Sequence, residues 1–188
     1  MGVVKKIVRK AEYRVFKKGM VIELRDDINL LVGDQGAGKS TLLKALSQPN
    51  EYAAFEFMTD GSVGTKFFDT ESGNPRVTQS NLDIKQKVVS KFSSHGETMK
   101  PIVLHCRHIK DSVILIDEPE SGLSIRSQLE MIEAFKEAVA NKCQLIIATH
   151  SPILMQSVDA VYSVEHKKWM SPENFILSQH KKQKTKRK

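Results

Sequence analysis

The sequence predicts an α/β fold in which helices cover both faces of a mostly parallel central sheet. Three short runs are almost entirely apolar, as strands buried on both faces are, at residues 28–32, 112–116 and 145–148. Between the second and third runs, residues 129–139 carry apolar side chains at the 3.6-residue spacing of a helix. Strands and helices that alternate in this way typically build a parallel sheet between two helical layers.

The N-terminal part of the chain contains strand patterns, a glycine-rich segment and one helix. Gln48-Pro49-Asn50 ends that helix, and the glycines at 61–64 indicate a loop. The elements expected here are antiparallel strands at 3–9 and 13–24, a turn at Lys18-Gly19, the strand at 28–32, a helix over 40–46 and a short strand at 65–69.

The second part of the chain is expected to alternate between helix and strand. A helical lobe at about 72–108 is interrupted at Ser93-Ser94-His95-Gly96, and Pro152 suits the first turn of a helix. The elements expected here are that lobe, the strand at 112–116, a helix whose buried face holds Leu129, Ile132, Ala134, Phe135, Ala138 and Val139, the strand at 145–148, a helix at 152–157 and a last strand at 161–165.

Composition indicates one ordinary globular domain. The chain has 188 residues, of which 40% are hydrophobic and 27% charged. No apolar stretch approaches the roughly 20 residues that cross a bilayer, and the N-terminus lacks the features of a secretory signal. Cys106 and Cys143 form neither a metal-binding spacing nor a C-x-x-C pair, so we expect reduced thiols and a cytoplasmic location.

Positive charge is concentrated at the two ends of the chain. The net charge is +7, yet residues 1–18 and residues 180–188 together carry more positive charge than that, so the centre is net acidic. We expect residues 179–188 to be a disordered basic tail outside a domain at 1–178. Such a tail binds nucleic acid or another polyanion, or only improves solubility.

The segment 33–40 has the full pattern G-x-x-x-x-G-K-[ST] of a phosphate-binding loop. It follows an apolar strand and precedes a helix, which is the context that this motif requires. Backbone N–H groups of the loop and the helix N-terminus would face phosphate oxygens, Lys39 would reach the β- and γ-phosphates, and Ser40 would bind Mg²⁺. The residues expected to contact nucleotide are Gly33, Asp34, Gln35, Gly36, Ala37, Gly38, Lys39, Ser40 and Thr41.

Polar side chains follow the next two buried strands. Asp117 and Glu118 come at the end of the run that begins at residue 112, and His150 follows the run that ends at Ala148. In α/β sheets, ligands bind at the carboxyl ends of parallel strands. We therefore expect Asp117 to hold Mg²⁺ opposite Ser40, Glu118 to orient or deprotonate a water, and His150 to contact the γ-phosphate.

Taken in order, these motifs resemble the head of ABC-type ATPases, and in particular small stand-alone members. Asp117-Glu118-Pro119 with Ser121-Gly122-Leu123-Ser124 is similar to a Walker B segment that runs into a D-loop, and His150 is similar to the switch histidine. Ser93-Ser94-His95-Gly96-Glu97 resembles the signature loop Leu-Ser-Gly-Gly-Glu, from which it departs at Ser93 and His95. The resemblance covers roughly residues 1–178.

Two positions of that family pattern stay open in this sequence. Glu71, at the end of the strand expected at 65–69, resembles the Q-loop residue by position, and Gln79 is its rival. Tyr13 and Phe16 are the candidate aromatic contacts to adenine.

The resemblance implies an ATPase that works as an ATP-dependent homodimer with two ATP molecules between the subunits. One subunit would hold ATP and Mg²⁺ through Lys39, Ser40 and Asp117, and Ser94 and Gly96 of the other would cap the γ-phosphate. A role with nucleic acid is expected from the basic ends. The alternatives are the ATPase subunit of a membrane transporter with a permease partner, a regulatory or defence ATPase that gates an effector, and a small-molecule kinase.

Overall fold

A computed structural model describes residues 2–12, 15–68 and 104–185 of the chain. The main sheet has six strands in the order β5-β6-β7-β3-β8-β9, and all neighbouring pairs are parallel except the edge pair β8 and β9. This arrangement confirms the mostly parallel sheet. Its strands are β3 (Ile28–Val32), β5 (Thr65–Phe68), β6 (Val113–Asp117), β7 (Gln144–Ala148), β8 (Val161–Ser163) and β9 (Lys168–Met170).

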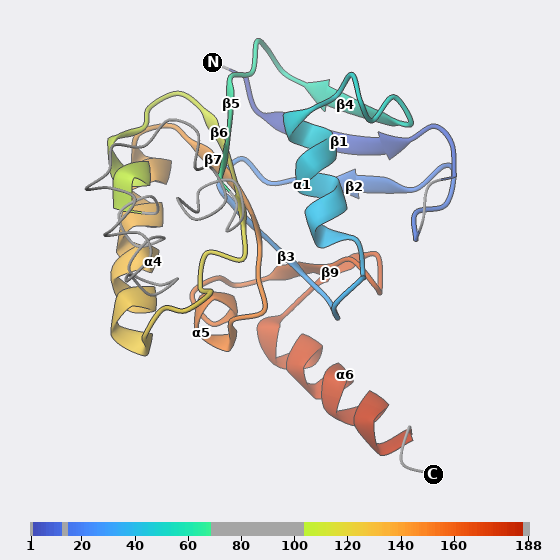
Figure 1. Ribbon diagram of the computed structural model, residues 1–188, viewed down its shortest axis with the longest axis vertical. Helices are drawn as coiled ribbons and strands as arrows, with labels where there is room; N and C mark the ends of the chain where they lie inside the picture. Colours follow the sequence, from blue (N-terminus) through green and yellow to red (C-terminus); the bar gives the residue numbers. More distant parts are fainter. Residues whose placement is uncertain (1, 13–14, 69–103, 186–188) are drawn as a thin grey trace, which may run out of the picture.

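A small antiparallel sheet packs beside the main one (Figure 1). It consists of β1 (Val4–Arg9), β2 (Val21–Glu23) and β4 (Phe55–Thr59), in the order β2-β1-β4. Of the strand expected at 13–24, residues 13–14 lie outside the described residues, and the described part forms a strand only at β2. A tight turn precedes β2, with Gly19 at a positive φ of 81° and a bond from the Met20 N–H to the Lys17 carbonyl.

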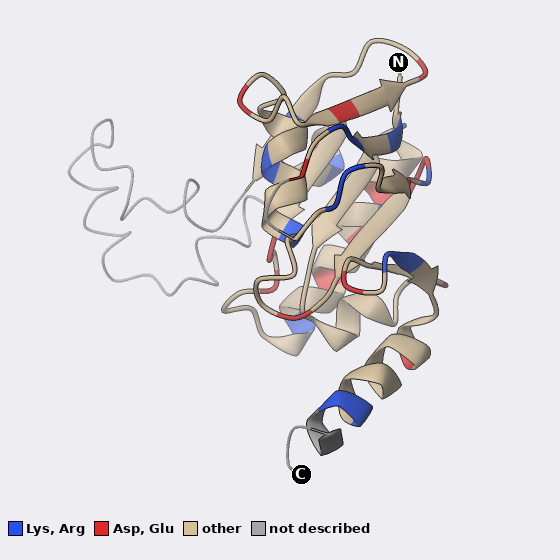
Figure 2. Ribbon diagram, turned by 90° about the vertical axis from the view of Figure 1, so that its right-hand side faces the viewer, with Lys and Arg blue, Asp and Glu red and all other residues tan. Residues whose placement is uncertain are grey.

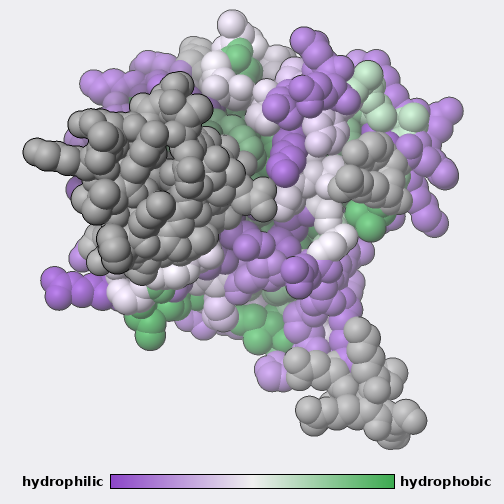
Figure 3. Space-filling model, viewed as in Figure 1, coloured by the Kyte–Doolittle hydropathy of each residue, from purple (hydrophilic) through white to green (hydrophobic). Residues whose placement is uncertain are grey.

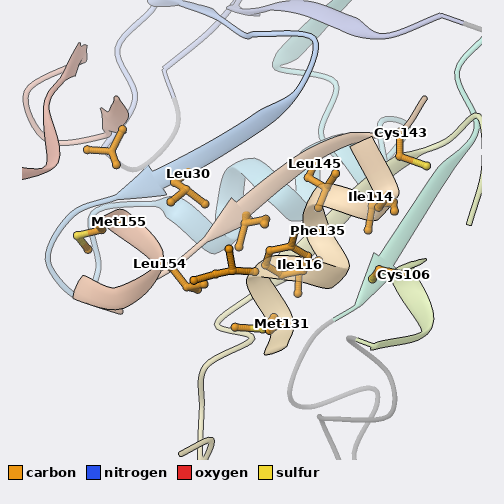
Figure 4. Packing of buried hydrophobic residues seen from close by; sticks show 14 of the residues in the cluster. Leu30, Cys106, Ile114, Ile116, Met131, Phe135, Cys143, Leu145, Leu154 and Met155 are labelled. Atoms are coloured by element: carbon orange, nitrogen blue, oxygen red, sulfur yellow. The ribbon is translucent and has the colours of Figure 1, made fainter. Parts of the chain in front are cut away.

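Helices cover both faces of the main sheet, as the alternation predicts. Successive strand residues point to opposite faces, so Leu30 packs in one core and Leu31 in the other. The first core joins the sheet to α4 (Ile125–Ala140) and α5 (Pro152–Met155), and Figure 4 shows Met131 and Phe135 of α4 against Ile114, Ile116 and Leu145. The second core joins it to α1 (Lys39–Ser47) and the small sheet.

The buried face of α4 differs from the expected one at three positions. Ile132, Ala134, Phe135 and Ala138 are buried as expected, and Met131 is buried although it was not expected. Leu129 is 53% exposed, and Val139 is only partly buried. Leu129 lies at the margin of this face and lines a surface groove between α4 and α5. The helix begins at Ser124, whose hydroxyl accepts a bond from the Ser127 N–H.

The C-terminal end of the described chain is more ordered than the sequence indicates. β9 and α6 (Pro172–Thr185) follow β8, so the segment expected to be disordered is helical as far as Thr185. Phe175 anchors the start of α6 in the first core, and the C-terminal end of the helix projects away from the body (Figures 1 and 2). Of the expected helical lobe, the described part includes η1 (Cys106–His108). Among the described residues, no helix is long and apolar enough to cross a membrane.

Figure 3 shows hydrophilic side chains over much of the described surface on one face, with small separate hydrophobic patches. The exposed apolar side chains come from different elements, for example Met58 of β4, Ile125 of α4 and Leu177 of α6. Single exposed apolar residues of this kind are ordinary in globular proteins.

Gln144, at the start of β7, links the two sheets through its buried side chain. Its Oε1 accepts a bond from the Val4 N–H (2.8 Å), and its Nε2 donates to the carbonyls of Val4 (2.9 Å) and Arg25 (2.6 Å). We expect Gln144→Ala to lower the free energy of unfolding by about 2–4 kcal/mol, because three buried backbone groups lose their partner. Denaturant unfolding of the ligand-free protein measures the change. The exposed Gln156 offers the same substitution as a control, and an equal effect at both positions would contradict the assignment.

Candidate functional site

The glycine-rich segment forms a loop between the end of β3 and the start of α1. Gly36 and Gly38 have positive φ values of 80° and 101°, which side chains rarely adopt. Gly38 is the N-cap of α1, and it provides no side-chain acceptor for the first N–H groups of the helix. These donors and the positive end of the helix dipole together favour an anion at this point.

Phe16 is buried under the loop, in contact with the backbone at Gly38. Its side chain is 2% exposed, its ring meets Phe55 edge to face, and a Cβ added to Gly38 would lie only 2.5 Å from its Cζ. This burial argues against Phe16 as the aromatic contact to adenine. The other candidate, Tyr13, lies outside the described residues, and the exposed Val15 lines the cavity next to the loop.

Lys39 bends back over the loop that precedes it. Its Nζ lies 3.1 Å from the carbonyl oxygen of Gly33, 3.3 Å from that of Asp34 and 2.8 Å from Nε2 of His150. Burial lowers the pKa of Lys39, and the carboxylates of Glu118 and Asp117 oppose this change. The ammonium group is therefore poorly solvated and well placed to gain from a bound anion.

Asp117 and Ser40 face each other across the sheet edge. The Ser40 hydroxyl donates to Oδ1 of Asp117 at 3.1 Å, although the two residues are 77 positions apart. β7 lies between β3 and β6 in the sheet, so the ends of the three strands meet at one edge. Burial raises the pKa of Asp117, and the bond from Ser40 partly offsets this.

Glu118 and His150 lie on the open side of the same cavity. Glu118 has a φ of 49°, in the left-handed region, and its Oε1 lies 3.5 Å from Nε2 of His150. Backbone strain of this kind is more frequent at functional sites than elsewhere. The His150 N–H donates to Oε1 of Glu120 at 2.6 Å, which fixes the backbone that carries the imidazole.

One cavity joins these side chains. Its volume is about 300 Å³, and it is open to solvent above the loop. It is lined by Val15, Gln35, Gly36, Gly38, Lys39, Ser40, Thr41, Glu118 and His150. The structure thus places the residues expected from three separate motifs around a single space.

Comparison with known proteins agrees with this arrangement. A protein-family profile described as "AAA domain, putative AbiEii toxin, Type IV TA system" matches residues 102–156, which is less than a third of the chain. A chain of a protein assigned as a metal-chelate type ABC transporter, in an inward-facing conformation, is 17% identical with a TM-score of 0.56, over 83% of this chain and 76% of that one. cbiO1 from Clostridium perfringens, part of the ABC transporter complex cbiONQ, is 15% identical with a TM-score of 0.55, over 94% and 92%. No curated protein matches significantly in sequence.

This chain has the fold of an ABC-type ATPase head. The elements that resemble Walker A and Walker B and the switch histidine lie at the carboxyl edge of its sheet, on β3, β6 and β7.

The oxygen donors at this site fit Mg²⁺. Asp117 and Ser40 offer a carboxylate and a hydroxyl oxygen side by side, and these are the ligand types that Mg²⁺ prefers. The part of the chain that the structure describes contains no cluster of three or more His, Cys, Asp or Glu side chains able to hold a metal. Mg²⁺ usually takes one or two protein ligands and completes its shell with water and phosphate oxygens, so two oxygen donors are enough here.

Four residues of the family pattern stay predictions. Glu71, its rival Gln79, and Ser94 and Gly96 of the signature-like loop all lie outside the described residues.

Two contacts at the site were not expected from the sequence. Glu120 holds the backbone of His150, and Glu165, just after β8, accepts a bond from the Asp34 N–H at 2.6 Å. The first contact could have been anticipated, because Glu120 belongs to the acidic segment that begins at Asp117. For Glu165 the sequence holds no comparable signal, because its partner is 131 residues away.

Proposed function

We propose that this chain binds ATP with Mg²⁺ and hydrolyses it to ADP and phosphate. The observation that carries the proposal is the single cavity around Lys39, Ser40, Glu118 and His150, with Asp117 bonded to Ser40. A phosphate loop, a carboxylate for the metal and a second carboxylate for water are the parts that ATP hydrolysis requires. The fold and the profile match support the same reaction class.

Each of these residues has a specific role in the proposal. Lys39 leaves its carbonyl partners and contacts the β- and γ-phosphates, while Ser40 and Asp117 hold Mg²⁺, which neutralises charge on the phosphates when bound. Glu118 orients or deprotonates the attacking water. His150 contacts the γ-phosphate and keeps its imidazole in place through the bond from its N–H to Glu120.

We further propose an ATP-dependent homodimer. The cavity is open to solvent, and the signature-like loop with Ser94 and Gly96 would close it from a second copy. ATP would then form part of the interface, and its hydrolysis would let the subunits separate.

Ion pairs within the protein reduce the number of basic side chains that remain for contact with nucleic acid. Three of the basic N-terminal residues form ion pairs: Lys5 pairs with Asp26 and Asp60, Lys6 with Glu23, and Lys10 with Glu56. Lys17 and Lys18 are exposed. Arg9 is buried and stacks on Phe55 at 4.1 Å. The support for a nucleic-acid role therefore comes from Lys17 and Lys18, from the basic end of α6, blue in Figure 2, and from the residues that follow it in sequence.

A transporter ATPase subunit is the second candidate, because the two similar solved structures described above come from ABC transporters. The experiment that tests both is an ATPase assay of the full chain alone, with DNA, with RNA and with liposomes, at two salt concentrations. Stimulation by DNA or RNA that fades with salt supports the nucleic-acid role. Stimulation by liposomes favours the transporter, and absence of ATP turnover in every arm would overturn the proposed reaction.

A further inference from the structure

The helix α6 is connected to the phosphate loop through one carboxylate. Glu165 lies just after β8, at the same sheet edge as the loop, and its side chain is only 16% exposed. Its Oε1 accepts the bond from the Asp34 N–H at 2.6 Å, and a Cβ added to Gly33 would lie 3.4 Å from its Cγ. Gly33 and Asp34, the first two residues of the loop, therefore lie directly against the side chain of Glu165.

Two side chains of α6 hold the other oxygen of the same carboxylate. Lys182 Nζ donates to Oε2 of Glu165 and also lies 3.6 Å from Oδ2 of Asp34. Gln179, one helical turn earlier, donates to Oε2 of Glu165 at 3.5 Å. Burial disfavours the ionised form of Glu165, but the bonds from Lys182 and the Asp34 N–H outweigh it and hold its pKa at about 2. The carboxylate is thus ionised at neutral pH.

These contacts have an electrostatic consequence for an anion bound to the loop. Asp34 and Glu165 place two negative charges at the start of a loop whose ligand carries several, and Lys182 is the cation that lies against both. A cavity of about 250 Å³ separates α6 from the loop and from His150, so the helix lies beside the nucleotide site.

We propose that α6 is a strap that positions the phosphate loop: Lys182 docks the helix on Glu165, and Glu165 holds the backbone of Asp34. This inference rests on the proposed nucleotide binding and adds a regulatory element to it. A partner that draws α6 away from the loop would expose the two carboxylates and weaken nucleotide binding. Glu165 and Lys182 act here as positioning residues, since neither lines the cavity above the loop.

The test compares Lys182 with Lys168, an exposed lysine of β9, in the full chain. ADP with Mg²⁺ is titrated by calorimetry into the wild type, Lys182→Ala and Lys168→Ala. Because Lys182 is partly exposed to solvent, we expect Lys182→Ala to weaken ADP binding by about three- to tenfold at low salt, and the loss to shrink as salt rises. Lys168→Ala removes the same charge and is expected to leave the affinity within twofold, roughly the scatter of a surface substitution.

A second measurement separates positioning from general charge. Hydrogen exchange at the Asp34 amide should speed up in Glu165→Ala and stay slow in Glu165→Gln, which keeps an oxygen acceptor for the N–H. Three results would each overturn the proposed positioning of the loop by α6. These are equal ADP affinity in the wild type and Lys182→Ala, an equal loss of affinity in both lysine variants, and unchanged hydrogen exchange in Glu165→Ala. If the wild type does not bind ADP at all, the proposed function fails instead, so the two failures are distinguishable.

Discussion

Glu118→Gln is expected to slow ATP hydrolysis by about 100-fold or more while nucleotide binding is retained. Glu118 follows β6 directly, in a left-handed backbone conformation that turns it toward the cavity, 3.5 Å from His150. Glutamine keeps the size and a hydrogen-bonding oxygen of this side chain, but it cannot accept a proton from water. The substitution therefore removes the base from the proposed reaction and little else.

The measurement is single-turnover hydrolysis of ATP, with binding measured separately by titration. In sizing experiments the variant should also keep an ATP-bound dimer for longer than the wild type, since hydrolysis is what separates the subunits in the proposed scheme. Hydrolysis at the wild-type rate would remove Glu118 from the reaction.

Glu120 provides a matched control within the same acidic run. Its carboxylate accepts a bond from the His150 N–H, and Glu120→Gln keeps an oxygen able to accept that bond. We therefore expect a milder effect, below about tenfold, because no proton transfer depends on this residue. Similar losses in both variants would indicate that the run acts through charge and not through a specific base.

The central strands and the ends that carry the site could be predicted because their signals are local. β3, β6 and β7 are buried on both faces, so each is mostly apolar, and a polar side chain at its carboxyl end is conspicuous. The shared edge then follows from the parallel arrangement, which is why Ser40 and Asp117 were expected to meet. The phosphate loop likewise has its full pattern within eight consecutive residues.

The parts that were missed depend on contacts between distant segments. α6 is strongly basic and has little apolar periodicity; its order comes from Phe175 in the core and from the bonds of Gln179 and Lys182 to Glu165. Leu129 fits the helical period but lies beside the α4–α5 groove, because the neighbouring helix is too short to cover it. Periodicity indicates which face of a helix is apolar, and only the packed neighbour decides how far burial extends.

Lys39→Ala is expected to weaken nucleotide binding by about 30- to 150-fold, because charge-assisted bonds to phosphate in a partly buried site contribute about 2–3 kcal/mol. Nζ of Lys39 lies within 3.3 Å of three acceptors around the loop, so it needs only a short movement to reach a phosphate bound there. Titration with ADP and with ATP, each with Mg²⁺, measures the loss. Lys136→Ala, on the outer face of α4, serves as the control.

Lys39→Ala should strongly weaken nucleotide binding but only slightly lower the free energy of unfolding of the ligand-free protein. Burial lowers the pKa of Lys39 in the folded state, so the unfolded chain binds the proton more tightly. The stability of the wild type should therefore rise as pH increases from the lowered folded pKa toward the unfolded value, and this rise should be absent in Lys39→Ala. Thermal unfolding across alkaline pH, with and without ADP, tests both statements: ADP should raise the melting temperature of the wild type only. A large loss of stability in ligand-free Lys39→Ala at neutral pH would mean that Lys39 is mainly a structural residue.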